Sequence, residues 1–376
     1  MSVLIILIVA LIALVLYLYF HRRRDRMTGY IPYIEGLIAL LENNGSLAMK
    51  KFKEAVTIDS DLVDAYIRLG DLYRKNGDVS RAIQIHQSLT VRPTLKTHEE
   101  KKIYYALVQD MLDTNRYNKA ISLLKEVLKI DKKDKSAQEL VLRLYEDMEN
   151  YVDCINLYEE GGIKPRENKK HAFYYASLAK TKLKNVTGDS PGREKEVVSL
   201  LKKALKISEN SLTALYHLGN YFEEKGDLKK AKEYYNKLIT HHPDYAFLII
   251  PKFEKVYFEL GSFDKIIPVF EKIFNDNPDN FSVGFALADL YEKKNDIEAA
   301  EDVHRKLSEK NPKSVLLQLR LLRSMVKDES LKESIIAIED TMSFKHFKCS
   351  KCGSETEQFS FLCPQCHTVE SFLPYL

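Results

Sequence analysis

The amino-acid sequence predicts an all-α protein of stacked helical pairs, with a transmembrane helix at its N-terminus and a small metal-binding domain at its C-terminus. Three features predict this: an apolar run from Val3 to Phe20, a recurrence of about 34 residues through the middle of the chain, and two CxxC motifs near its end. The 376 residues are 30% charged and 45% hydrophobic, so the chain can bury a large core. Its net charge of +3 is too small to indicate a nucleic-acid partner.

Residues 1–20 are predicted to form a transmembrane anchor, and residues 21–28 a basic juxtamembrane linker. The apolar run is eighteen residues long, which crosses most of a hydrocarbon core at about 1.5 Å per helical residue. Four arginines follow between residues 22 and 26, which places the rest of the chain in the cytoplasm by the positive-inside rule. The alternative, a cleaved signal peptide, would carry its positive charge before the apolar run. We therefore predict a single-pass membrane protein with a cytoplasmic C-terminal body.

Residues 29–342 are predicted to form about eight to nine helical pairs that stack into a right-handed superhelix. Small or aliphatic residues recur in steps of 34, 38, 34, 43, 34, 35 and 34 residues. This period is that of the tetratricopeptide repeat, in which a helical pair buries its apolar stripe only against its neighbours. The recurring positions are Ala48, Ala82, Ala120, Cys154, Val197, Ala231, Ile266 and Ala300.

Most repeat units pair a small residue on the first helix with a large residue on the second. The small residue stands twelve positions before the recurring one, and the large residue four positions after it. We expect the two helices to approach closely at the small residue. His86 and His304 occupy the large position, where a hydrogen-bonded core imidazole is expected. The glycines are Gly36, Gly70 and Gly219, and their partners are Phe52, His86 and Tyr235.

The longer steps indicate insertions, of four residues around Val91 to His98 and of nine around Asn185 to Arg193, which we expect to lie in loops. The segment from Ser314 to Met342 is expected to form a terminal helical pair. A GxSxG sequence at Gly188 to Gly192 lies within the second insertion, where no strand precedes the serine. A turn is therefore favoured over a nucleophile elbow. No catalytic residue is predicted, and Cys154 is expected to be a buried packing thiol rather than a reactive one.

Residues 343–376 are predicted to form a domain organised by one metal ion. The motifs Cys349-Ser-Lys-Cys352 and Cys363-Pro-Gln-Cys366 use four of the five cysteines, and each supplies two thiolates from one tight turn. Two disulfides or four unrelated thiols are the alternative reading. Such a site binds Zn²⁺, which is favoured here in a structural role, or a redox-active iron. His346 and His367 flank the cysteines and are considered as fifth or replacement ligands.

An apolar anchor, tetratricopeptide units and a C-terminal pair of CxxC motifs, in this order, resemble the lipopolysaccharide assembly protein B family. The points of match are the apolar run with its arginines, the stretch from Arg81 to Gln87, and the motifs Phe347–Gly353 and Cys363–Cys366. The resemblance implies an inner-membrane protein of Gram-negative bacteria that faces the cytoplasm and carries a rubredoxin-like metal domain packed against the repeats. It also implies that the four cysteines are the metal ligands. The implied partners are the membrane protease FtsH and the lipid A deacetylase LpxC, whose turnover such proteins control.

The sequence and this resemblance together predict a membrane-tethered adaptor that regulates lipopolysaccharide synthesis. A tether raises the effective concentration of the repeats near other membrane proteins. A partner segment is expected on the concave surface formed by the first helices of the repeats. Two alternatives remain: a general scaffold for a membrane-bound assembly, and an iron-containing redox protein. The candidate partner-binding residues are Asp71, Tyr105, Gln109, Tyr216, Asn220 and Asp289.

Overall fold

The computed structural model describes residues 11–17, 30–93, 95–159, 168–184, 191–342 and 346–375. The described chain divides into two compact units, Met1–Leu144 (unit 1) and Tyr145–Leu376 (unit 2). Of the predicted anchor only residues 11–17 are described, and they are helical; the rest of residues 1–20 and the linker 21–28 lie outside the described residues. Within the described part of the chain, no helix combines the length and the apolar character needed to cross a membrane.

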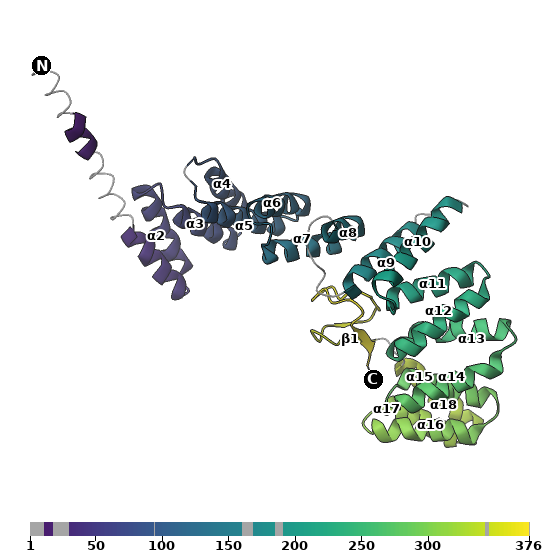
Figure 1. The fold of residues 1–376 in the computed structure, drawn as a ribbon. Coiled ribbons are helices and arrows are strands. Elements are labelled where there is room, and N and C mark those ends of the chain that lie inside the picture. Colours follow the sequence, from purple (N-terminus) through teal and green to yellow (C-terminus); the bar gives the residue numbers. More distant parts are fainter. Residues whose placement is uncertain are drawn as a thin grey trace, which may run out of the picture. The chain divides into compact units, whose positions relative to one another are not determined.

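Unit 1 consists of consecutive helices that pack against one another (Figure 1). Its first described helix in the array covers residues 30–41. The helices that follow are α2 (Gly45–Ile58), α3 (Val63–Lys75), α4 (Val79–Thr90), α5 (Thr97–Asp113), α6 (Tyr117–Ile130) and α7 (Lys135–Asp147), whose last residues belong to unit 2.

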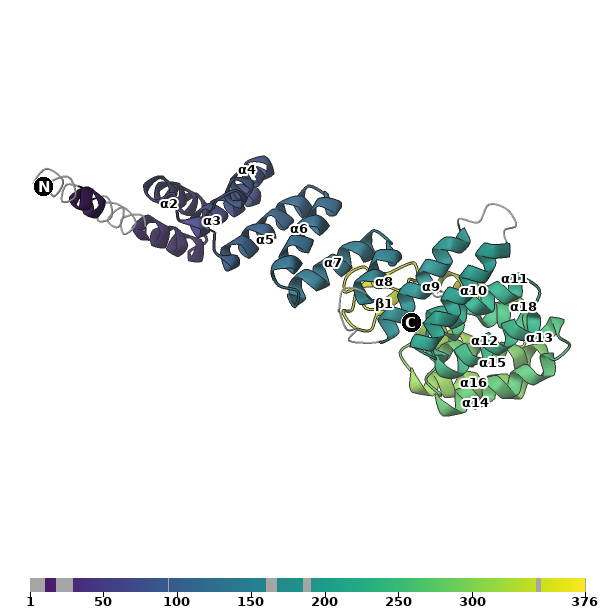
Figure 2. The same ribbon diagram turned by 45° about the horizontal axis from the view of Figure 1, so that its top comes forward.

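Unit 2 continues the helical pairs and ends in a small sheet (Figure 2). The sheet has the order β2-β1-β3 and is antiparallel, with Phe347 opposite both Thr356 and Pro374. The elements of unit 2 after α7 are α8 (Tyr151–Glu159), α9 (Asn168–Lys184), α10 (Pro191–Ile207), α11 (Leu212–Glu224), α12 (Leu228–His241), η1 (Pro243–Leu248), α13 (Ile250–Glu259), η2 (Phe263–Lys265), α14 (Ile266–Asp276), α15 (Phe281–Lys293), α16 (Ile297–Lys310), α17 (Val315–Met325), α18 (Glu329–Met342), β1 (Phe347–Cys349), β2 (Glu355–Thr356) and β3 (Phe372–Pro374).

The recurring small residues form the core of the helical pairs, as predicted. All eight, from Ala48 to Ala300, are fully buried. Each lies on the second helix of its pair, in α2, α4, α6, α8, α10, α12, α14 and α16. The predicted terminal pair is also present, as α17 and α18. The all-helical repeat architecture predicted from the period is therefore confirmed.

The predicted close approach between paired helices is confirmed at the glycines. A Cβ atom built on Gly219 would lie 2.3 Å from the ring of Tyr235, and one on Gly70 would lie 2.3 Å from Nε2 of His86. These distances are shorter than any van der Waals contact, so the ring of the second helix occupies the space that a side chain would need. The buried ring of His86 contacts Asp110 Oδ2 at 2.6 Å and the carbonyl of Ile67 at 3.1 Å, as expected for a core imidazole.

Most turns between the two helices of a pair share one backbone conformation. In seven of them one residue has a positive φ, between 51° and 86°, and ends the first helix in the left-handed region. The turn between α17 and α18 has no such residue, and the turn between α9 and α10 lies outside the described residues. In several pairs the next residue is Asn or Asp, whose side chain accepts a hydrogen bond from the first turn of the second helix, as Asp78 does from the amide of Arg81. The positive-φ residues are Asn43, Gly77, Asn115, Glu149, Gly226, Gly261 and Asn295.

Two expectations about the helices need correction. Neither insertion lies wholly in a loop. The first, Val91 to His98, overlaps the start of α5 at Thr97. The second, Asn185 to Arg193, overlaps the start of α10 at Pro191, a residue whose fixed φ suits the first turn of a helix; residues 185–190 lie outside the described residues. His304 is buried as expected, but neither ring nitrogen has a hydrogen-bond partner, and its Nε2 lies 3.7 Å from a carboxylate oxygen of Glu292.

The glycine at a close approach is expected to tolerate no side chain. In Gly219→Ala the new methyl group must displace Tyr235, whose hydroxyl donates to Asn220 and Glu223, so we expect the free energy of unfolding to fall by about 1–3 kcal/mol. Gly192→Ala is the matched control, because no atom lies within 4 Å of a Cβ atom there. It should be neutral or stabilise the helix by up to about 1 kcal/mol. Urea denaturation followed by circular dichroism measures both, and equal midpoints would contradict the packing described here.

Candidate metal centre

The four cysteines of the C-terminal domain converge on one point. Their sulfur atoms all lie within 4.8 Å of one another. The Sγ atoms of Cys349 and Cys366 are 3.7 Å apart, as are those of Cys352 and Cys363. A tetrahedral zinc ion with Zn–S bonds of about 2.3 Å places its ligands about 3.8 Å apart, whereas a disulfide requires about 2.05 Å. The residues present therefore fit one tetrahedral metal ion, and the disulfide reading does not describe this geometry.

Two similar turns hold the cysteines. In the first, the amide of Gly353 donates to the carbonyl of Cys349 at 2.9 Å; in the second, the amide of His367 donates to the carbonyl of Cys363 at 2.9 Å. Gly353 and His367 occupy the same position, directly after the second cysteine, and have φ values of 75° and 55°. The turn requires the left-handed conformation there, which glycine adopts without cost.

Hydroxyl groups surround the sulfur atoms. Ser371 Oγ lies 3.3 Å from the sulfur of Cys349, and Thr368 Oγ1 lies 3.2 Å from that of Cys366. Ser354 Oγ lies 3.3 Å from the sulfur of Cys363. Burial raises the pKa of Cys349, but hydrogen bonds from Ser371 and from backbone amides lower the pKa to about 6 overall. These hydroxyls would stabilise thiolates and orient them toward a metal ion.

The two histidines beside the cysteines are not positioned as ligands. Among the described residues, the group able to hold a metal consists of the four cysteines alone. His346 is exposed and its ring lies 6.2 Å from that of Tyr375. His367 directs its ring toward the repeats, where Nδ1 lies 2.6 Å from a carboxylate oxygen of Glu146 near the end of α7.

Glu146 is the centre of a buried polar cluster that joins the four-cysteine domain to the repeats of unit 2. Besides His367, its carboxylate is paired with Lys170 at 2.7 Å and accepts a hydrogen bond from the hydroxyl of Tyr174. Burial raises the pKa of the Glu146 carboxyl, but His367, Lys170 and Tyr174 together bring the pKa below its ordinary value. A charge this deeply buried is stable only with such partners, so the cluster fixes how the domain sits on α9.

Glu370 forms a second polar contact, at the N-terminus of α11. Its Oε1 accepts hydrogen bonds from the amide of Thr213 at 3.0 Å and from the Thr213 hydroxyl at 2.9 Å. Its other carboxylate oxygen is paired with Lys169 at 3.2 Å. The Tyr245 hydroxyl donates to the carbonyl of Glu370. A carboxylate at this place satisfies a free amide of the first helical turn and interacts favourably with the helix dipole.

Aromatic side chains complete the contact. Phe347 of β1 and Phe359 both pack on Phe247 of η1, with ring centroids 5.6 and 5.5 Å apart. Phe361 packs on Tyr216 of α11 at 5.5 Å. The same apolar cluster contains Cys349, Cys363 and Cys366, so the metal-binding turns share their core with the repeats. Figures 1 and 2 both show strand β1 beside the start of α9.

Sequence reasoning missed the residues that join this domain to the repeats, namely His367, Glu370, Glu146 and Thr213. His367 and Glu146 are 221 positions apart in the chain, and Glu370 and Thr213 are 157 positions apart. The one local signal was His367 itself, a non-glycine residue where the first turn has Gly353.

The predicted partner-binding residues are distributed over both units, and most already contact neighbours. In unit 1, Asp71 is paired with Arg74 at 2.7 Å, and Gln109 is exposed. In unit 2, Asn220 accepts from Tyr235 and Lys252, and Asp289 lies 3.4 Å from Arg320. Tyr216 belongs to the contact with the four-cysteine domain.

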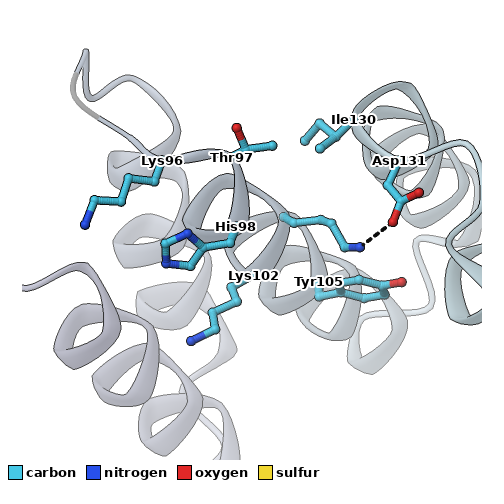
Figure 3. A pocket seen from close by; sticks show the side chains of 8 residues that line it. Lys96, Thr97, His98, Lys102, Tyr105, Ile130 and Asp131 are labelled. Atoms are coloured by element: carbon cyan, nitrogen blue, oxygen red, sulfur yellow. Dashed lines mark hydrogen bonds and ion pairs between the residues drawn. The ribbon is translucent and has the colours of Figure 1, made fainter.

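Tyr105 lines a pocket of about 540 Å³ at the start of α5 (Figure 3). Its hydroxyl donates to Asp134 at 2.6 Å, and the neighbouring Lys101 is paired with Asp131 at 3.0 Å. The basic groups are therefore partly neutralised by acidic ones within the same unit. The lining residues are Lys96, Thr97, His98, Lys101, Lys102, Tyr105, Ile130 and Asp131.

The fold and the cysteine site together define a tetratricopeptide-repeat protein with a C-terminal four-cysteine domain. The tetratricopeptide repeat family matches residues 65–98 and 213–245. Among solved structures, the chain is similar to Naa15/Naa10 bound to HypK, with 14% identity, 84% of this chain and 47% of that chain covered, and a TM-score of 0.41. It is also similar to the MamA protein, with 22% identity, 48% and 92% covered, and a TM-score of 0.33.

Curated relatives match nearly the whole chain. Lipopolysaccharide assembly protein B of Escherichia coli K12 is 23% identical over 352 residues, which cover 91% of this chain and 88% of the relative. The protein of the same name from Haemophilus influenzae is 26% identical over 366 residues, with 91% and 89% covered. The resemblance to the lipopolysaccharide assembly protein B family is therefore confirmed.

Loss of one cysteine should release the metal and free the C-terminal domain. Structural zinc contributes about 10–16 kcal/mol of apparent folding free energy in small domains, so Cys349→Ser should lose stoichiometric metal and unfold residues 346–375. Most of the helical signal, which comes from the repeats, should remain. Metal analysis and circular dichroism measure the two effects.

Cys154→Ala is the matched control, because this buried thiol lies in α8 and outside the metal-binding group. It should retain one metal ion per chain. Full metal content in the Cys349→Ser protein would contradict the four-sulfur site. A visible thiolate-to-iron absorption band in the unaltered protein would identify the metal as iron instead of zinc.

Proposed function

We propose that this chain is a non-enzymatic, membrane-tethered adaptor that regulates lipopolysaccharide synthesis. The observation that supports this most strongly is the combination of helical repeats with a docked four-cysteine domain, in a chain similar over 91% of its length to proteins named for lipopolysaccharide assembly. Fold alone does not specify a function, so the site and the relatives carry the proposal together.

The chemistry of the described residues favours a binding protein over an enzyme. The four convergent cysteines are arranged to be saturated by one metal ion, which leaves no open position for a substrate. The fifth, Cys154, is fully buried, and burial raises the pKa of its thiol far above the ordinary value. The four-cysteine set fits zinc, which when bound would hold the two turns together. The four cysteines would supply all its ligands, and the neighbouring hydroxyls would interact with their sulfur atoms.

The proposed mechanism depends on confinement to the membrane. We assign the apolar run at residues 3–20 as a single-pass inner-membrane anchor and the body as cytoplasmic. Confinement raises the effective concentration of the repeats near other membrane proteins, so weak individual contacts suffice. The proposed partners are the membrane protease FtsH and its client LpxC, with the repeats presenting one to the other. Exposed residues on the first helices, such as Gln109, are the proposed contacts.

The adaptor proposal predicts that the anchor acts only by location. A chain without residues 3–20 should fold normally but lose most of its ability to regulate the deacetylase, since only its effective concentration at the membrane has changed. The same chain with an unrelated anchor of the same orientation is the matched control and should recover most of that ability. The half-life of LpxC and the lipopolysaccharide content of cells depleted of the native protein are the measurements.

Depletion alone should lengthen the half-life of LpxC and raise lipopolysaccharide. An unchanged half-life would contradict the adaptor proposal and favour a general scaffold for a membrane-bound assembly. Full activity of the chain without any anchor would contradict the role of the tether.

A further inference from the structure

The first helix of the array, residues 30–41, exposes a continuous apolar stripe. Tyr30, Ile31, Ile34, Ile38 and Leu41 are between 49% and 83% exposed. Their spacing of three and four residues places them along one face of the helix. The opposite face packs on α2 and α3, where Tyr33, Leu37, Ala39 and Leu40 join the buried cluster around Phe52. This helix is therefore apolar on both sides. In Figure 1 it is the helix directly before α2, separate from the darker helix of residues 11–17.

The stripe is unusual for the end of a repeat array. A terminal repeat has no neighbour on its outer side, so a polar outer face is required to keep it soluble. Glu35, a charged residue of this helix, is paired with Lys51 of α2 at 2.5 Å and does not interrupt the stripe. A helix that is apolar all round is normally buried, and an exposed stripe of this kind marks an interaction surface.

The position of the stripe in the chain indicates what covers it. Arg22, Arg23, Arg24 and Arg26 lie directly before it, and the apolar run ends at Phe20. Tyr30 is four residues after Arg26, and four residues of chain reach at most about 14 Å in any conformation. If the apolar run is the membrane anchor of the proposed function, the arginines lie among anionic headgroups and the stripe begins within that distance of them.

A lipid surface fits the stripe better than a protein does. A stable protein interface involves about 20–30 residues on each side, whereas the stripe has five. A membrane is always present next to a tethered helix and needs only a narrow apolar face to accept it. Tyr30, at the end nearest the arginines, is a residue type enriched at the boundary between lipid and water.

We propose that residues 30–41 lie in the membrane interface, with Ile31, Ile34, Ile38 and Leu41 inserted at the boundary between headgroups and acyl chains. The contact would hold the first repeat flat against the bilayer, so that unit 1 projects from the membrane at a fixed angle instead of turning freely about its tether. This inference rests on the membrane tether of the proposed function and adds a second, interfacial contact to it.

The sequence contains no tryptophan, so a single introduced tryptophan reports on the surroundings of one chosen position. Ile38→Trp in the full chain creates a sole tryptophan on the stripe, and Val91→Trp creates one at the end of α4. Val91 is 81% exposed and lies in the same unit, so it is the matched control. Each protein is reconstituted into vesicles of phosphatidylethanolamine and phosphatidylglycerol, with or without brominated acyl chains, which quench tryptophan only by contact. Flotation of the vesicles measures anchoring separately.

We expect both proteins to float with the vesicles, and brominated lipid to reduce the emission of the Ile38→Trp protein at least about twofold while the control is unchanged. Flotation without quenching would overturn the interfacial contact and leave the tether intact. A blue-shifted but unquenched emission would mean that protein covers the stripe, which also overturns the proposal. Failure to float would contradict the tether itself, and with it this contact.

Discussion

A domain of about thirty residues cannot bury enough apolar surface to fold alone, and this constraint determines how the C-terminal part of unit 2 is built. Below about 40 residues a chain usually requires a metal, disulfides or association with another surface. Residues 346–375 use two of these: a four-sulfur site and a shared core with the repeats. Phe347 and Phe372 are buried in the same cluster as Cys349 and Cys363, so a bound metal ion and docking would stabilise one another.

The polar contacts make this association specific. Glu370 is held at the start of α11, while His367 reaches Glu146 at the end of α7. His367 closes the second cysteine turn and Glu370 follows three residues later, so the backbone that would hold the metal also orients the side chains that bind the repeats. The four-cysteine domain is thereby part of unit 2.

Much of this organisation could be predicted from the sequence, because its physical causes are local or periodic. The close approach of Gly219 to Tyr235 requires a small residue at a fixed spacing, and the CxxC motifs place two ligands in one turn. The contacts of His367 and Glu370 could not be predicted, because each depends on a residue more than 150 positions away. The missing hydrogen bond at His304 depends on side-chain packing that the repeat period does not encode.

Hydrogen exchange at the amide of Thr213, before and after metal removal by a chelator, tests most directly whether metal binding and docking are one cooperative event. In the metal-loaded protein this amide donates to Glu370 and should be protected. After metal removal its exchange should accelerate by at least about tenfold, while the helices of unit 1 exchange as before. Unchanged protection of Thr213 in the metal-free protein would show that docking of the four-cysteine domain does not depend on the metal.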